Sequence, residues 1–144
     1  MRAYNEVYLD EIVETQGRLF EEAPEYYAGS LDVADFIAAY MKSEARARID
    51  RADPYVCTKD AVELWEYFLK TSSYVPKTGQ GIGGFAPNWI GQFYAYFQWY
   101  HNVRSSKLIK TIPVCDMLRI YPGLHDLDIK LAVVKIGKAY GFRG

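Results

Sequence analysis

Hydrophobic positions early in the chain recur at three-, four- and seven-residue steps, the spacing of one helix face. Acidic side chains lie between them over residues 4–23, so this stretch predicts an amphipathic helix ending near Pro24. A second helix is expected to begin at Asp32, a good N-cap residue, and to end in a charged tail over residues 42–51, closed by Asp53 and Pro54. The apolar positions are Tyr8, Ile12, Leu19 and Phe20 in the first helix and Val33, Phe36, Ile37, Tyr40 and Met41 in the second.

A third helix is predicted after Thr58, which can cap it. Its inward side is expected to carry Val62, Trp65, Phe68 and Leu69. The helical pattern then stops, because residues 72–85 contain Pro76 and four glycines and show no apolar period. These residues predict a loop that separates a helical half, residues 1–71, from a second helical half, residues 86–144.

The segment around Pro87 has the most informative pattern in the chain. Aromatic and aliphatic side chains cover most of the circumference of a helix over residues 86–102, leaving a narrow stripe of small and amide residues. Gly91 and Ala95 on that stripe would let a neighbouring backbone come close. We therefore place this helix at the centre of a bundle. Its large apolar residues are Trp89, Ile90, Phe93, Tyr94, Tyr96, Phe97, Trp99 and Tyr100.

Three shorter helices are predicted after it. Ser105 and Ser106 can cap one that reaches residue 112, a second covers residues 114–121 before Pro122, and Asp126 opens the last. The last helix carries apolar Leu127, Leu131, Val134 and Ile136 and basic Lys130, Lys135 and Lys138. No segment shows sustained two-residue alternation, so the predicted fold class is all-α. We expect a single domain over residues 1–144, a compact bundle of six to seven helices around the aromatic helix 86–102.

Charge adds an asymmetry to this picture. Residues 1–72 hold 8 Lys and Arg against 15 Asp and Glu, and residues 73–144 hold 9 against 3, although the net charge of the chain is only −1. The halves either neutralise each other in the fold or present faces of opposite sign to different partners. We take internal neutralisation as the simpler interpretation.

The two cysteines and the absence of long apolar runs define the expected compartment. Cys57 and Cys115 lie in unrelated segments without a CxxC pair, so the sequence predicts neither a disulfide framework nor a zinc cluster. Cys115, beside Val114 and Met117, is interpreted as a small core residue. The N-terminus lacks the pattern of a leader, and no stretch approaches the roughly 18 apolar residues of a membrane span. A soluble, cytoplasmic protein is expected.

Candidate chemistry is sparse. Residues 79–84 match GxGxxG, but no convincing strand precedes them and no Asp or Glu follows before Asp116, so a flexible loop is favoured over a dinucleotide site. His101 and His125 have no local signature that would pair them with a cysteine nucleophile or a metal. We therefore predict no catalytic, cofactor-binding or metal-ligating residues and a protein that is not an enzyme.

Two kinds of partner remain open. The C-terminal half is basic, and residues 107–121 could form two short helices around a tight turn, as in DNA-binding proteins, although Arg119 alone would read bases. Alternatively, a partly exposed edge at the end of the aromatic helix would bind a protein, since Tyr, Trp and Arg often anchor interfaces. The predicted partner-binding residues are Tyr96, Trp99, Tyr100, His101 and Arg104, and the basic residues are Arg104, Lys107, Lys110, Arg119, Lys130, Lys135, Lys138 and Arg143.

Four blocks of sequence resemble a small uncharacterised bacterial family. They read LDVADF at 31–36, DPYV at 53–56, FYAYFQWY at 93–100 and IYPGLH at 120–125, and the resemblance spans nearly the whole chain. Members of this all-helical family are short cytoplasmic proteins of gut Firmicutes and their relatives, often encoded beside companions similar to ADP-ribosyltransferase-type toxins. The resemblance implies an antitoxin-like or accessory role and assigns no catalytic residues. The expected function is a non-catalytic protein-binding module, with a helical DNA-binding regulator as the alternative.

Overall fold

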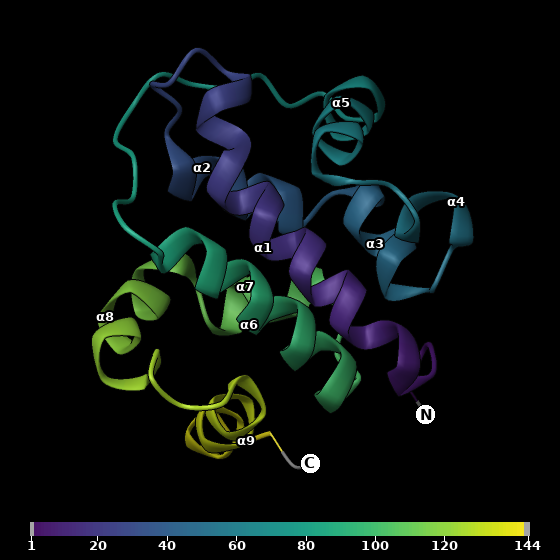
Figure 1. The fold of residues 1–144 in the computed structure, drawn as a ribbon, viewed down its shortest axis with the longest axis vertical. Helices are drawn as coiled ribbons and strands as arrows, with labels where there is room; N and C mark the ends of the chain where they lie inside the picture. The colour runs from purple at the N-terminus through teal and green to yellow at the C-terminus, as the bar shows by residue number, and fades with distance from the viewer. Residues whose placement is uncertain (1, 143–144) are drawn as a thin grey trace.

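The computed structural model describes residues 2–142, and within them the chain forms helices and no strand (Figure 1). A short 3-10 helix, η1 (Glu6–Tyr8), leads into α1 (Leu9–Tyr26), α2 (Val33–Met41), α3 (Glu44–Asp50), α4 (Pro54–Cys57), α5 (Ala61–Thr71), α6 (Ala86–His101), α7 (Ser105–Thr111), α8 (Val114–Leu124) and α9 (Ile129–Ala139). The predicted all-helical fold class is confirmed. No helix of residues 2–142 is both long enough and apolar enough to cross a membrane.

Helices α1 and α6 form the centre of the bundle. They lie across the middle of the molecule, with α3 to α5 on one side and α8 and α9 on the other (Figure 1). A Cβ atom on Gly91 would lie 2.5 Å from the carbonyl oxygen of Gln16, and one on Gly17 would lie 2.8 Å from that of Asn88. The two backbones therefore approach each other through glycines, as the small-residue stripe of the aromatic helix predicts.

One continuous hydrophobic core includes side chains from both halves of the chain. Phe36 lies near its middle, with its ring centroid 6.1 Å from Phe20, 5.2 Å from Trp65 and 5.7 Å from Phe68. On α6 the rings of Phe93 and Phe97 are fully buried. Edge-to-face and tilted ring pairs of this kind add to the stabilisation from burial itself.

The described residues form nine α-helices, more than the predicted six to seven, because the expected second helix is divided into α2 and α3 and a further short helix, α4, begins at Pro54. Ser43 accepts the N–H of Arg46 at 3.2 Å and begins α3, and Asp53 accepts the N–H of Tyr55 at 3.0 Å and begins α4. The residues predicted to form a charged tail are therefore a separate helix. It buries Ala45, Arg46 and Ile49.

Several predicted helix ends are wrong by one turn or less. Pro24 and Pro122 lie inside the last turns of α1 and α8, so each helix continues past the proline near which it was predicted to end. Asp60, not Thr58, caps α5, because it forms a reciprocal pair with Glu63 in which each carboxylate accepts the other's backbone N–H at 2.9 Å. The last helix is capped by Asp128, whose carboxylate accepts the N–H of Lys130 at 2.9 Å, and not by Asp126.

Single side chains in two helices depart from the helix pattern. In α5, Trp65 and Phe68 are buried as predicted, but Val62 is exposed and Leu64 is buried. In α9, Leu131 is exposed, while Ala132 and Val133 are buried. The small side of α9 faces α6 because the ring of His101 packs directly against Gly137, which leaves no room for a longer side chain there. Leu131 is thereby left on the outer face.

Candidate functional site

A mostly apolar hollow of about 350 Å³ lies between the start of α1 and α4. We call it the N-terminal groove. Its walls come from two segments about forty positions apart, and nothing in the local sequence pattern of either one indicates that they meet. The groove is lined by Tyr4, Tyr8, Glu11, Ile12, Ala52, Pro54, Cys57 and Thr58.

Two exposed tyrosines accompany the groove. Tyr8, predicted on the inward stripe of the first helix, lies at the end of η1 and is 60% exposed, and Tyr55, next to Pro54, is 64% exposed. The Tyr55 ring is held in place, because the Lys59 amino group lies 4.1 Å from its centroid and the Tyr67 ring lies 5.9 Å away. Exposed aromatic rings beside a hollow have the character of interface anchors.

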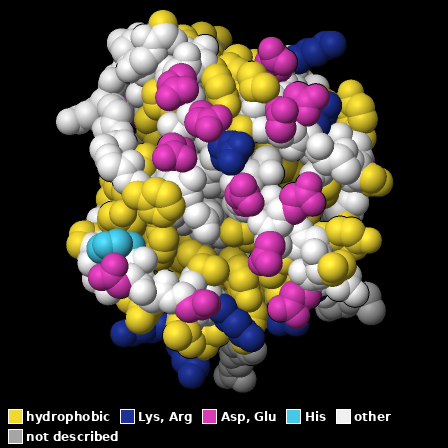
Figure 2. All heavy atoms as spheres, in the orientation of Figure 1, with side chains coloured by type: hydrophobic (Ala, Val, Ile, Leu, Met, Phe, Trp, Pro, Cys, Tyr) yellow, Lys and Arg dark blue, Asp and Glu magenta, His cyan; other side chains and the backbone are white. Residues whose placement is uncertain are grey.

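Acidic side chains surround the helical side of the groove. Glu11 is part of its lining, and Glu6, Asp10 and Glu14 are exposed along η1 and α1. The Glu14 carboxylate is 3.5 Å from Arg18 in an exposed pair, which weakens the local field only slightly. Figure 2 shows acidic side chains spread over the face that α1 crosses, with few basic ones among them. The groove thus combines apolar walls with a negative potential.

The end of α6 supports the groove from inside the molecule. The indole N–H of Trp99 donates a hydrogen bond to the backbone carbonyl of Tyr4 at 2.8 Å, and their ring centroids lie 6.3 Å apart. The Arg2 guanidinium lies 4.6 Å from the Trp99 ring, and its Nε–H donates to the Tyr100 carbonyl at 3.2 Å. These contacts hold the N-terminal segment, whose Tyr4 lines the groove, against the core.

The five predicted partner-binding residues do not form one exposed surface. Tyr96 and Trp99 are buried, Tyr100 and His101 are half-buried, and Arg104 is exposed. The first four therefore contribute mainly to packing. Trp99 is the member connected to the groove, through its hydrogen bond to Tyr4.

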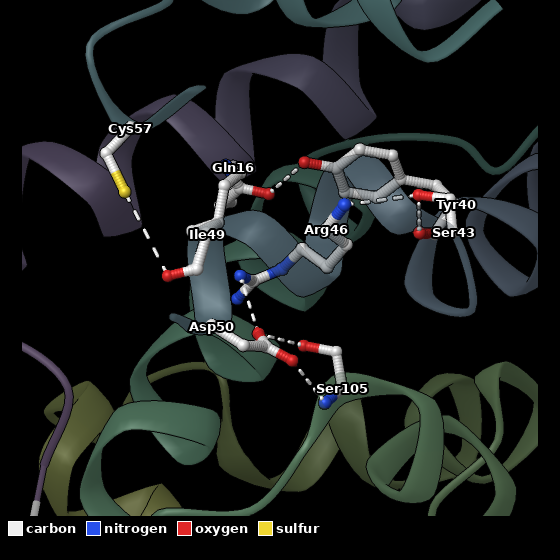
Figure 3. Close-up of polar contacts among 8 residues, drawn as sticks. All are labelled: Gln16, Tyr40, Ser43, Arg46, Ile49, Asp50, Cys57 and Ser105. Atoms are coloured by element: carbon white, nitrogen blue, oxygen red, sulfur yellow. Dashed lines mark hydrogen bonds and ion pairs between the residues drawn. The ribbon is translucent and has the colours of Figure 1, made fainter. Parts of the chain in front are cut away.

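A buried cluster of Arg46, Asp50 and Ser105 behind the groove joins the two halves of the chain (Figure 3). The Arg46 side chain is 1% exposed and donates from Nη1 to the Asp50 carboxylate at 3.0 Å. Asp50, on α3, also accepts the backbone N–H of Ser105 at 2.8 Å and its hydroxyl at 2.7 Å, at the start of α7. The prediction that Ser105 caps the helix is therefore wrong. Ser105 is the first residue of α7, and a carboxylate from the other half of the chain holds it. Sequence reasoning missed Arg46 because a charged residue is expected to be solvated.

Two further contacts in Figure 3 link this ion pair's surroundings to the groove. The Tyr40 hydroxyl donates to Gln16 Oε1 at 2.7 Å, joining α2 to α1, and the Cys57 thiol donates to the Ile49 carbonyl at 3.9 Å, joining α4 to α3. Burial raises the pKa of the Cys57 thiol, and burial raises the pKa of Tyr4 to about 12. A neutral thiol is a poor nucleophile, so Cys57 serves the wall of the groove by packing.

The histidines and cysteines lie apart from one another in structural settings. Nε2 of His101 is 3.2 Å from the Val133 carbonyl oxygen, and Nδ1 of His125 is 2.9 Å from the Tyr121 carbonyl oxygen at the end of α8. Cys115 is exposed, so its predicted place in the core is wrong. Its buried neighbours Val114 and Met117 are three positions apart and share a helix face that excludes it. Among residues 2–142, no group of three or more His, Cys, Asp or Glu could hold a metal ion.

The glycine-rich segment is a loop fastened to the start of α2. The N–H of Asp32 donates to the Lys77 carbonyl at 2.8 Å, and the N–H of Gly79 donates to the Ser30 carbonyl at 2.9 Å. Thr78 forms an isolated bridge with Leu31, and no strand precedes the GxGxxG match within the described part of the chain. The segment is therefore a connecting loop between α5 and α6 that is hydrogen-bonded to the residues before α2.

Direct ion pairing neutralises little of the charge asymmetry. Among the ion pairs of residues 2–142, Lys77 with Asp35, at 3.6 Å, joins the two halves, and the others lie within one half. Basic side chains gather along the lower edge of Figure 2, where Figure 1 places α9. The acidic and basic surfaces therefore remain largely separate.

Comparisons with protein-family models, with curated proteins and with solved structures find no match to this chain. The resemblance to the gut Firmicutes family stays a prediction. Function is argued below from the groove, the contacts behind it and the charges around it.

Proposed function

We propose that this protein is a non-catalytic protein-binding module and that the N-terminal groove is its docking site. The observation that carries the proposal is an apolar hollow that includes the exposed ring of Tyr8 and lies beside an acidic helix face, with exposed Tyr55 adjoining Pro54 of the lining. Such a surface fits a segment that offers a hydrophobic anchor flanked by lysine or arginine.

The buried contacts behind the groove support this function by making it rigid before any partner arrives. The Trp99 hydrogen bond to Tyr4 holds the N-terminal wall against α6, and the contact of the Cys57 thiol with the Ile49 carbonyl joins the α4 wall to α3. A preformed site loses less conformational entropy on binding than a mobile one. Specific interfaces also gather their binding energy in a few aromatic anchors rather than over a whole surface.

The proposed partner is a companion protein in the cytoplasm, in line with the antitoxin-like or accessory role that the family resemblance implies. The acidic surface of the groove would speed encounter with a basic region of that companion and would make binding weaker at high salt. No catalytic group is needed for sequestration. The partner-facing residues proposed are Tyr8, Glu11 and Tyr55, with Trp99 acting from behind through Tyr4.

The test is titration calorimetry with the purified product of the neighbouring gene. Tyr8→Ala and Tyr55→Ala should each weaken binding by about tenfold or more, because each removes an anchor ring. Phe85→Ala is the matched control, since Phe85 is an exposed aromatic residue in the turn before α6 that neither lines the groove, as Tyr8 does, nor adjoins a lining residue, as Tyr55 adjoins Pro54. Failure to bind any neighbouring product at micromolar concentration, or equal losses in all three variants, contradicts the proposal.

DNA binding by the basic half is the alternative proposal, and one observation weakens it. Arg119, the base-reading candidate of α8, is held by the Asp116 carboxylate at 2.9 Å. A regulator would shift its own promoter DNA in a salt-dependent manner, and Lys107→Glu with Lys110→Glu would abolish the shift. The same pair of substitutions should leave docking in the N-terminal groove unchanged.

A further inference from the structure

The outer face of α9 resembles the kind of segment that the N-terminal groove would accept. Leu131 is 59% exposed, and the exposed residues Lys130, Lys135 and Lys138 lie on the same helix. Leu127, just before the helix, is also exposed, but it lies between the carboxylates of Asp126 and Asp128. Leu131, Lys135 and Lys138 are spaced four and three residues apart, so they share one side of the helix. Among residues 2–142 none of these three lysines takes part in an ion pair. The face is thus an apolar and basic surface without an internal partner.

The groove and this face complement each other in both apolar content and charge. The groove side offers Tyr8, with Glu11 and Glu14 beside it on α1, and the α9 face offers Leu131 between lysines. We infer that a second copy of this chain docks its α9 face into the N-terminal groove. The inference rests on the proposed function, because it names an occupant of the same groove.

Three features favour a second copy over other occupants of the α9 face. Exposed leucines gain nothing from a phosphate backbone, whereas a tyrosine-lined groove shelters them from water. Every copy carries both surfaces, so the concentration of complementary surfaces equals the concentration of the protein itself. The chain has a net charge of only −1, so overall repulsion between copies is small while the separated charges still attract.

The geometry of such an association has two forms. The contact joins two different surfaces, so it closes into a two-fold pair if both groove contacts form between the same two molecules, and otherwise it adds copies in a row. In either form the groove is occupied when the protein is alone. A companion protein would then have to displace the second copy, which makes partner binding weaker as the concentration of this protein rises.

Sedimentation velocity of the purified full chain tests the inference. At low salt the average mass should rise over a series from about 1 µM to about 500 µM, and it should fall back toward the monomer in about 1 M salt. The α9 variant carries Lys135→Glu and Lys138→Glu, and the groove variant carries Glu11→Lys and Glu14→Lys. Each variant alone should dissociate about tenfold more readily than the unaltered protein.

The decisive experiment mixes the two variants, whose charges are reversed on opposite sides of the proposed contact. A one-to-one mixture of the α9 variant and the groove variant should associate again, because the acidic α9 face of one meets the basic groove of the other. Lys107→Glu with Lys110→Glu on α7 is the matched two-charge control and should leave the mass series unchanged. Circular dichroism checks that each variant remains helical.

The outcomes separate this inference from the proposed function. A protein that stays monomeric throughout the series, or mixed variants that do not associate, overturns the inference. Capture of anionic vesicles or DNA by α9 without a rise in mass also overturns it, because the face then has a different occupant. If Tyr8→Ala still weakens companion binding in these cases, the proposed function stands. If Tyr8→Ala leaves companion binding unchanged while the mass series behaves as expected, the proposed function fails alone.

Discussion

Asp50 and Ser105 are fifty-five residues apart in the chain, and the carboxylate of one accepts both the backbone N–H and the hydroxyl of the other, at 2.8 Å and 2.7 Å. The same carboxylate also accepts a hydrogen bond from the buried Arg46 guanidinium. One acidic side chain therefore neutralises a buried cation and satisfies the first N–H of α7. It also connects the acidic half of the chain to the basic half.

Asp50→Ala should lower the free energy of unfolding by about 3–5 kcal/mol, because it leaves the Arg46 guanidinium buried without its carboxylate partner. Urea denaturation followed by circular dichroism measures the change. Glu44→Ala, which breaks the exposed pair with Arg51, is the control and should cost less than about 1 kcal/mol. Equal effects of the two substitutions would show that the buried pair has no special role.

Gly91→Ala should destabilise the protein by about 1–3 kcal/mol, because the added Cβ would lie 2.5 Å from the Gln16 carbonyl oxygen and would force α1 and α6 apart. Thermal and urea unfolding both report this. Gly123→Ala is the matched control, since nothing lies within 4 Å of a Cβ at that position in the last turn of α8. It should leave stability unchanged or raise it slightly, and a similar loss in both variants would refute the close-contact argument.

The free energy of unfolding should fall at alkaline pH because the Tyr4 side chain is buried. Burial raises its pKa from 10.0 to about 12, so the folded state holds the phenolic proton more tightly than the unfolded chain does. This contribution is fully present below pH 10 and is lost as the pH rises toward 12.

Tyr4→Phe removes that contribution, so the stability of the wild type relative to the variant should decline over this pH range. Urea unfolding at several pH values measures it, with Tyr40 and Tyr94 titrating equally in both proteins. At neutral pH the variant should be nearly as stable as the wild type, because the Tyr4 hydroxyl is buried and makes no hydrogen bond among the described residues. Parallel pH curves would contradict the assignment.

The two cysteines should react with an aromatic disulfide reagent at very different rates. Cys115 is exposed and should react quickly at neutral pH, whereas burial raises the pKa of the half-buried Cys57 and should slow its reaction. Cys115→Ser should remove the fast phase and Cys57→Ser should keep it. A fast phase that disappears with Cys57→Ser instead would mean that the groove wall opens readily.

Much of the fold is encoded in short stretches of sequence. The spacing of apolar residues predicts the helical class, Asp32 caps α2 as predicted, and the glycine and alanine stripe of residues 86–102 predicts the close contact that Gly91 makes. These features depend on the backbone within a few residues or on one helix surface, so a single segment carries the information. The prolines alone do not fix the ends of α1 and α8, because both helices continue past Pro24 and Pro122.

Periodicity and capping therefore let the sequence by itself determine that this chain is a bundle of helices with an aromatic helix at its centre. Only the tertiary structure decided which single side chains depart from the helix pattern. Arg46 is buried because Asp50 and Ser105 close over it, while Tyr8 and Leu131 are exposed because nothing packs on them. The N-terminal groove likewise exists only where α1 and α4 meet, forty positions apart. Burial and cavities are properties of the assembled elements, so no single stretch of the chain specifies them.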